Sequence, residues 1–268
     1  MEKEKQKNEF ISVITPVFNC EKLIEETIMC VKNQTYTDWE MIIVNDGSTD
    51  KTEDIINKYL DDSRIKYYRL EKNYGVAVAR NYALNKIKGR FVAFLDADDL
   101  WKKDKLEKQV DFMMKNNYAF TCTDYEKIDE EGGSLKVVKV PKKINYEKFL
   151  RNTIIQTVGV MVDTFITGKE LLVMPNIRTR QDAATWSQLL KNGYDCYRVP
   201  ENLSYYRLVH KSLSSNKFKM IKINWYWYRN IEKLPLLKAC YCWCWYIVNA
   251  IKKRIYFRKF LTVLNKGK

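Results

Sequence analysis

The chain lacks most features that mark a secreted, disulfide-bonded or membrane-spanning protein. Its seven cysteines are an odd number and form no paired framework, which indicates a reducing compartment. The charged N-terminal stretch MEKEKQKNEF has no apolar core of the kind that a signal peptide needs. No linker rich in proline or serine and no internal repeat divides the chain. We therefore expect a cytoplasmic protein with one large domain, alone or with a C-terminal appendage.

Acidic residues are scarce near the C-terminus, which makes the charge of the chain uneven. The chain carries 47 Lys and Arg against 33 Asp and Glu, a formal net charge of +14. Residues 217–268 contain thirteen of these basic residues and one acid, Glu232, so that this tail alone carries +12. The remaining +2 over residues 1–216 leaves the body nearly neutral. We therefore treat residues 1–216 as the body and residues 217–268 as a separate basic, aromatic tail.

The tail has no apolar run long enough to span a membrane. Its longest, Ala239 to Val248, has about ten residues, half of what a spanning helix needs. Stretches such as NWYWYRN and IKKRIYFRKF mix aromatics with cations, which predicts a helix lying peripherally on the anionic inner face of the cell membrane. A helical subdomain that packs against the body, or against a second copy in a homo-oligomer, is the alternative. The spacing of Cys240, Cys242 and Cys244 is a weak metal motif because no other ligand cluster accompanies it.

Buried strands alternate with amphipathic helices through the first hundred residues. Apolar, β-branched runs predict strands at 10–15, 41–45, 65–70 and 91–95, with helices between them, the last over Gly75 to Lys88. This alternation is typical of an α/β protein with a mostly parallel central sheet that helices cover on both faces. After residue 104 the pattern loosens, with a helix to about Lys115, a strand at 118–126 and short strands near 195–199 and 203–208.

Three carboxylates follow the fourth predicted strand in the stretch RFVAFLDADDLW. Asp96, Asp98 and Asp99 would repel one another if they were left bare, so they need an explanation. Solvated turn residues, an acid/base pair and a divalent metal that offsets the repulsion are the three candidates. Ligands of parallel sheets bind beyond the carboxyl ends of the strands, where Pro16–Phe18 and Asp46 also fall. This shared edge favours a ligand site over a plain turn.

Four motifs in order resemble those of the family-2 glycosyltransferases, which have the GT-A fold: PVFN (16–19), VNDGSTD (44–50), NYGVAVARN (73–81) and FLDADDLW (94–101). The resemblance covers roughly residues 10 to 215. It implies a Rossmann-like nucleotide-sugar half over about 10–103, an acceptor half over about 104–216 and a helical C-terminal extension. It also implies a metal-dependent, inverting hexosyltransferase of the bacterial surface-polysaccharide type. The expected donor is a UDP-sugar, and the expected acceptor is a hydroxyl of a glycan or a lipid-linked sugar.

The resemblance also assigns roles to the residues that match the motifs. Seven residues would contact the nucleotide: Pro16, Phe18, Asp46, Asn73, Arg80, Asp96 and Arg207. Asp98 and His210 would bind Mn²⁺ or Mg²⁺, with Asp99 in a supporting role. Four of these assignments have a plainer alternative: Phe18 in the core, Asp46 as a turn acid, Arg80 as a solvated helix residue, and the lone His210 as a packed or surface residue.

The proposed catalytic base lies in RTRQDAATWSQLL (178–190). Asp182 opens a predicted helix in which Trp186 and Leu190 repeat every four residues. The family usually has Glu-Asp at this place, and this chain has Gln181-Asp182. By resemblance, Asp182 would take the proton of the acceptor hydroxyl, while an acid favoured by the helix dipole is the plainer alternative.

Two rival functions come from other classes of protein. The missing glutamate before Asp182 suggests a catalytically impaired module that only binds sugar nucleotides. The net charge of +14 suggests a nucleic-acid-binding protein. We expect no nucleic-acid partner, because the charge is confined to an aromatic, apolar tail and no recognised nucleic-acid motif is present.

Overall fold

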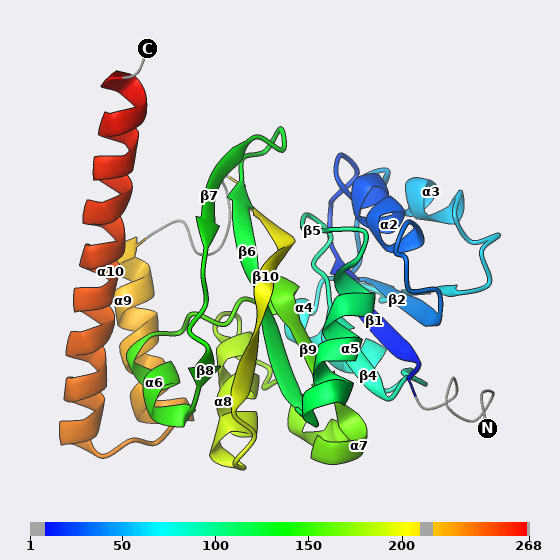
Figure 1. Ribbon diagram of the computed structural model, residues 1–268. Coiled ribbons are helices and arrows are strands. Elements are labelled where there is room, and N and C mark those ends of the chain that lie inside the picture. The colour runs from blue at the N-terminus through cyan, green and yellow to red at the C-terminus, as the bar shows by residue number, and fades with distance from the viewer. Residues whose placement is uncertain (1–8, 210–216, 267–268) are drawn as a thin grey trace.

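The computed structural model describes residues 9–209 and 217–266, and its centre is a ten-stranded sheet (Figure 1). The strand order is β3-β2-β1-β4-β9-β6-β10-β5, with β7 beside β6 and β8 beside β10. The strands are β1 (Ile11–Val17), β2 (Trp39–Asn45), β3 (Ile65–Arg69), β4 (Phe91–Phe94), β5 (Leu100–Trp101), β6 (Phe120–Ile128), β7 (Ser134–Val138), β8 (Lys143–Ile144), β9 (Val160–Asp163) and β10 (Cys196–Arg207). The helices are α2 (Ile24–Lys32), α3 (Thr52–Asn57), α4 (Val76–Leu84), α5 (Lys105–Asn116), α6 (Tyr146–Arg151), α7 (Thr164–Thr167), α8 (Gln181–Lys191), α9 (Lys217–Tyr226) and α10 (Leu236–Lys266). Single turns η1 (Thr157–Gly159) and η2 (Lys169–Leu172) and a π-helical turn η3 (Trp227–Ile231) complete the chain.

The first half of the sheet is parallel, as its continuous apolar strands predict. Strands β3, β2, β1 and β4 pair in parallel, and every residue of β1 and β2 is buried. The apolar side chains of alternate residues enter two clusters, with Val13 in one and Ile14 in the other. Helices α2 and α5 contribute to the Val13 cluster, and α4 and α8 to the Ile14 cluster. The α/β class with a central sheet flanked by helices is therefore confirmed.

The second half of the sheet is mixed rather than parallel. Strand β9 lies between β4 and β6 and is antiparallel to both, while β10 is parallel to β6. Strands β6 and β7 form an antiparallel hairpin, which needs only the turn at 129–133. Parallel neighbours need a crossover, usually through a helix. The parallel pattern therefore ends where the regular alternation of strands and helices ends in the sequence.

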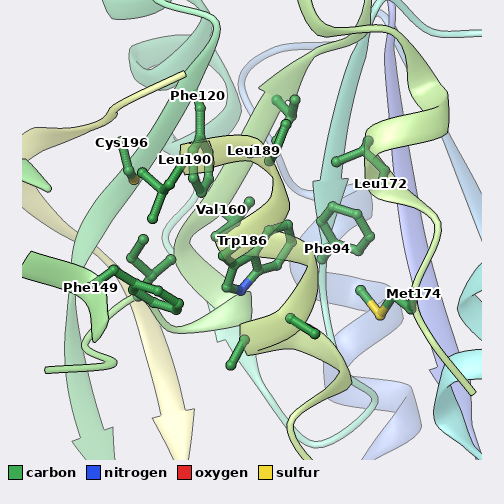
Figure 2. Close-up of a cluster of buried hydrophobic side chains, with 14 of the residues drawn as sticks. Phe94, Phe120, Phe149, Val160, Leu172, Met174, Trp186, Leu189, Leu190 and Cys196 are labelled. Carbon is green, nitrogen blue, oxygen red and sulfur yellow. The ribbon is translucent and has the colours of Figure 1, made fainter. Parts of the chain in front are cut away.

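Trp186 fixes α8 against the sheet, and it thereby positions the start of that helix. Its side chain is fully buried, with ring centroids 5.3 Å from Phe94 of β4 and 5.7 Å from Phe120 of β6 (Figure 2). Leu189 and Leu190 are buried as well, so the predicted repeat of Trp186 and Leu190 lies on a buried side of the helix. Removing a buried tryptophan of this kind typically costs about 3–5 kcal/mol of unfolding free energy.

The first half of the tail packs against the body. Figure 1 shows α9 and α10 side by side at the left of the molecule, next to α6. Trp227 and Tyr228 are buried, the Trp227 ring lies 6.2 Å from that of Phe149, and the Tyr228 hydroxyl donates to the Leu150 carbonyl oxygen. Further along α10, Asn249 Nδ2 donates to the carbonyl oxygen of Arg151 at 3.0 Å.

Ion pairs join the same surfaces. Glu232, the one acid of the tail, accepts from the Tyr146 hydroxyl at 2.8 Å and from Lys191 Nζ at 2.6 Å. Lys238 of α10 pairs with Glu147 of α6 at 2.6 Å. These contacts connect the first half of the tail to the body across the predicted boundary at residue 216. None of the helices within residues 9–209 and 217–266 combines the length and the apolar character that crossing a membrane would need.

Candidate active site

The loops that follow β1 and β2 form one hydrogen-bonded unit at the carboxyl edge of the sheet. The backbone N–H of Asn19 donates to Ser48 Oγ at 2.9 Å, and that of Thr49 donates to Asn19 Oδ1 at 2.8 Å. The N–H of Cys20 donates to Thr52 Oγ1 at 2.8 Å. The first two motifs of the sequence are thus locked together, and the prediction that they converge on one edge is confirmed.

Asp46 fixes the start of α4. It is buried, and its two carboxylate oxygens accept the backbone N–H groups of Tyr74 and Gly75, each at 2.8 Å. Gly47 has a φ of +73°, and a Cβ there would lie 2.6 Å from the carbonyl carbon of Lys72, so only glycine lets the two loops approach this closely. The turn role that was the alternative for Asp46 is therefore present. Each oxygen keeps a second lone pair, so nucleotide contact stays a prediction.

Arg80 and Asp96 form an ion pair at this edge. Arg80 is buried on α4, with Nη2 bonded to Asp96 Oδ1 and Nη1 3.6 Å from Met174 Sδ. A solvated Arg80 is therefore wrong. The Asp96 side chain is 31% exposed, which leaves part of it open to a ligand. The pair sets the direction of Asp96 at the end of β4, and the ribose contact of Asp96 stays a prediction.

The pKa values of Asp98 and Asp99 are both raised. Burial, followed by repulsion from Asp96, raises the pKa of Asp98 to about 6. Burial and then the charges of Asp98 and Asp96 raise the pKa of Asp99 well above its usual value. Carboxylate oxygens are the ligands that Mn²⁺ and Mg²⁺ prefer, and a cation here would offset the repulsion, so these residues fit the predicted metal.

A complete protein cage for this metal is absent from the part of the chain that the structure describes. Within residues 9–209 and 217–266, no group of three or more His, Cys, Asp or Glu side chains is arranged to hold a metal ion. His210, the second predicted ligand, lies outside the described residues.

Arg207 holds the turn that contains Asp98 and Asp99 through hydrogen bonds. It is 4% exposed, and its Nε donates to the Asp98 carbonyl oxygen at 2.9 Å. Its Nη1 donates to the Glu130 carbonyl oxygen and its Nη2 to Glu26 Oε2, each at 2.7 Å. Its backbone N–H donates to Asp99 Oδ1 at 2.9 Å. This geometry gives Arg207 a supporting role that the sequence did not reveal, and it does not favour the predicted contact with a diphosphate.

The remaining nucleotide candidates divide into exposed and buried residues. Phe18 is 46% exposed, so the core alternative for it is wrong. Asn73 is exposed on the loop that Asp46 holds, and Tyr74 on the same loop is 44% exposed. Pro16 is buried within β1, and its nucleotide contact stays a prediction. Tyr74 lies inside the third motif, NYGVAVARN, but the sequence alone did not single it out as an exposed residue of this edge.

Asp182 lies in the first turn of α8 and is half-buried. Its Oδ2 accepts from Thr157 Oγ1 of η1 at 3.4 Å. Gln181, where the family usually has glutamate, is 9% exposed, and its Oε1 has no hydrogen-bond partner among the described residues. The chain before α8 is tied to the donor half, because Asn81 of α4 and Met174 exchange two hydrogen bonds of 2.8 Å each. The two halves are thus connected next to Arg80, whose Nη1 also lies near Met174.

Known proteins share this sequence pattern along most of the chain. The family model described as glycosyl transferase family 2 matches residues 12–170. The teichuronic acid biosynthesis glycosyltransferase TuaG of Bacillus subtilis is 50% identical over 247 residues, which cover 91% of this chain and 97% of that protein. The Escherichia coli UDP-Glc:alpha-D-GlcNAc-diphosphoundecaprenol beta-1,3-glucosyltransferase WfgD is 37% identical over 247 residues, 92% of this chain and 95% of that one.

Solved structures share the fold at lower identity. The structure of TarS residues 1–349 of S. aureus in complex with UDP-GlcNAc matches with a TM-score of 0.68 at 19% identity, over 89% of this chain and 71% of that one. The mannosyltransferase PcManGT of Pyrobaculum calidifontis, in complex with GDP-Man and Mn²⁺, matches with a TM-score of 0.61 at 20% identity, over 75% and 58% of the two chains. These likenesses confirm the GT-A fold. Together with the matched family model and the close relatives, they show that this chain belongs to glycosyltransferase family 2.

Proposed function

We propose that this glycosyltransferase moves a sugar from a UDP-sugar to a hydroxyl of a lipid-linked glycan, with inversion, in surface-polysaccharide biosynthesis. The observation that carries the proposal is the group of Arg80, Asp96 and Asp98 at the carboxyl edge of the parallel strands. The functions named for the Bacillus and Escherichia relatives, at 50% and 37% identity, support the acceptor class and the pathway.

The donor half would bind the nucleotide through residues that the fold already orders. The exposed ring of Phe18 would lie against the uracil, with Asn73 beside it. Asp96, whose direction Arg80 sets, would accept hydrogen bonds from the ribose hydroxyls. Asp46 would act at the edge of the same pocket, through the lone pairs that the loop leaves open.

Asp98, with His210 as a second ligand, would hold Mn²⁺ or Mg²⁺. When bound, such an ion supplies positive charge that stabilises the negative charge developing on the departing nucleotide diphosphate. The raised pKa of Asp98, about 6, is consistent with a carboxyl that lies in a site built to receive a cation. Asp99 supports the turn through its hydrogen bond to the Arg207 backbone.

Asp182 would take the proton from the acceptor hydroxyl as that oxygen attacks the anomeric carbon. The bond from the anomeric carbon to the diphosphate oxygen breaks as the new bond to the acceptor oxygen forms on the opposite face. A single displacement of this kind inverts the anomeric centre, so an α-linked donor yields a β-linked product. The β linkage in the name of the Escherichia relative supports this stereochemistry.

The tail would hold the enzyme at the inner face of the membrane. Four exposed apolar residues of α10 follow one another at helical spacing: Leu237 (86% exposed), Tyr241 (51%), Trp245 (38%) and Val248 (39%). Beyond them, residues 252–268 carry seven Lys or Arg and no acid. An apolar face next to dense positive charge supports binding to an anionic lipid surface. The same face on a second copy of the chain is the alternative partner.

The test is a transfer assay on the purified full chain with UDP-glucose and UDP-GlcNAc, Mn²⁺ or Mg²⁺, and a synthetic diphospholipid-linked sugar as acceptor. We expect a lipid product of higher mass with one donor, no product in EDTA, and none from Asp98→Asn. Asp111→Asn, at an exposed position of α5, is the matched control and should keep full activity. Binding of UDP-sugars without transfer or slow donor hydrolysis would instead support the impaired binding module.

A further inference from the structure

A cavity of about 260 Å³ lies between the segment that leads into α8 and the first helices of the tail. The segment 177–180 lines one side with Arg178 and Arg180, and α9 and η3 line the other with Ile223, Tyr226 and Trp227. We propose that this cavity binds the lipid end of the acceptor: a diphosphate at the two arginines and the first part of an isoprenoid chain along the apolar wall. This inference rests on the proposed function for the acceptor class, and it assigns the residues that recognise it.

The chemistry of the two walls matches the two parts of such a ligand. Guanidinium groups bind phosphate oxygens through paired hydrogen bonds, and two of them can serve the two phosphates of a diphosphate. Ile223 and Trp227 present apolar surface on the facing wall. Ligand cavities commonly measure about 300–1,000 Å³, so a cavity of about 260 Å³ suits the head group and a short length of chain rather than a whole lipid.

The cavity lies next to the proposed base along the chain. Arg180 is two residues before Asp182 and Arg178 is four residues before it. An extended chain spans at most about 3.5 Å per residue, so the two arginine Cα atoms lie within about 7 and about 14 Å of that of Asp182. The proposed base therefore follows closely on the arginine side of the cavity, where a sugar attached to a bound diphosphate would lie.

The conformation of Arg180 also points to a ligand. Its φ is +68°, in the left-handed region that a bulky residue adopts only where its surroundings hold it. Two hydrogen bonds of 3.0 Å hold it, from Nη1 to Thr153 Oγ1 and from Nη2 to the Tyr246 hydroxyl of α10. Its Nε is buried and has no hydrogen-bond partner among the described residues, so this guanidinium keeps one unused donor.

The experiment measures binding of three probes to the full chain by calorimetry: farnesyl diphosphate, farnesol and inorganic pyrophosphate. We expect farnesyl diphosphate to bind at least about tenfold more tightly than either other probe, because only it contacts both walls. Arg178→Ala should weaken both diphosphate probes about tenfold, and Tyr226→Ser should weaken farnesyl diphosphate and farnesol but not inorganic pyrophosphate. Both side chains are exposed at the rim of the cavity, so the fold does not depend on them.

Lys222→Ala is the matched control, since Lys222 is an exposed cation of α9 that does not line the cavity. It should leave all three affinities unchanged, and UDP should bind equally to all variants. The inference would be overturned if both Arg178→Ala and Tyr226→Ser left the affinity for farnesyl diphosphate unchanged. Displacement of farnesyl diphosphate by UDP would overturn it as well. Normal UDP-sugar binding in that case would leave the proposed function intact. A wild-type chain that binds farnesyl diphosphate at these residues but no UDP-sugar would refute the proposed function and support the cavity as a lipid diphosphate site.

Discussion

Replacing Asp98 by asparagine should make the metal-free protein more stable while it abolishes transfer. The pKa of Asp98 is raised to about 6 from an ordinary 3.8, first by burial and then by the charge of Asp96. At about 1.4 kcal/mol per pH unit, holding this carboxylate ionised in the native state costs about 3 kcal/mol at most. The part of the side chain that water reaches screens the charge and reduces the figure. Asparagine keeps the shape and removes the cost.

The sign of the effect depends on pH in a defined window. Below about pH 4 the carboxyl is protonated in both the native and the unfolded chain, so both variants should have similar stability. Between about pH 4 and pH 6 the unfolded chain releases its proton while native Asp98 keeps it, and the wild-type protein loses stability relative to the variant. Above pH 6 the full difference is present. For a chain of this size about 1 kcal/mol shifts Tm by about 2–4 °C, so Asp98→Asn should melt up to about 6–12 °C higher at pH 8.

Thermal melting in EDTA at pH 4, 6 and 8 measures this difference, with Asp111→Asn as the control that should stay within about 0.5 kcal/mol. Adding Mn²⁺ at pH 8 should raise the Tm of the wild-type protein and leave that of Asp98→Asn nearly unchanged, because only a native state that binds the ion gains from it. Equal melting temperatures of the wild-type protein and Asp98→Asn at pH 8 would refute the argument from burial and charge. A difference in Tm at pH 4 as large as the one at pH 8 would refute it as well. Equal stabilisation of both proteins by Mn²⁺ would remove Asp98 from the metal site.

Three further predictions concern the base, the supporting arginine and the tail. Asp182→Asn should keep UDP-sugar binding and lower turnover by about 10²–10⁴; weaker donor binding at unchanged turnover, measured by steady-state kinetics, would place Asp182 in the donor site instead. Arg207→Met should lower the free energy of unfolding by about 2–4 kcal/mol in urea titrations, because the Asp98 and Glu130 carbonyl oxygens and the Glu26 carboxylate lose their donor; a variant of normal stability that fails to bind UDP would restore the diphosphate role. Deleting residues 252–268 should preserve the fold and abolish flotation with anionic vesicles, because seven cations are lost. Deleting residues 217–268 should unfold the body, because it removes buried aromatic side chains. Vesicle binding that survives the shorter deletion would point to the apolar face of α10 alone.

The sequence by itself determined the donor half of this protein. A strand of a parallel sheet is buried on both faces, so it appears as an unbroken apolar run such as those of β1 and β2. The carboxyl ends of such strands meet at one edge, which is why the sequence alone could place Asp46 and Asp96 at the same edge of the sheet. These relations are local in the chain or follow from general topology, so they can be read without knowing the packing.

The mixed half of the sheet was decided only by the tertiary structure. Strand β9 pairs with β4 and β6, which are distant in sequence, and no local pattern encodes such a register. The role of Arg207 depends on Glu26, which lies 181 positions away. Side-chain contacts at this separation exist only once the chain is folded, so a motif can suggest a ligand role for a residue that the fold uses as support.

The tail shows the same limit at the level of composition. Aromatics and cations such as those of residues 217–251 are suited equally to a membrane surface and to a protein surface. The structure selects packing for Trp227 and Tyr228, because α6 and its neighbours offer the Phe149 ring and the Leu150 carbonyl oxygen as partners. It leaves Leu237 and Tyr241 of α10 exposed. Composition therefore determined which kinds of surface the tail can bind. Only the shape of the body determined which residues of the tail pack against it.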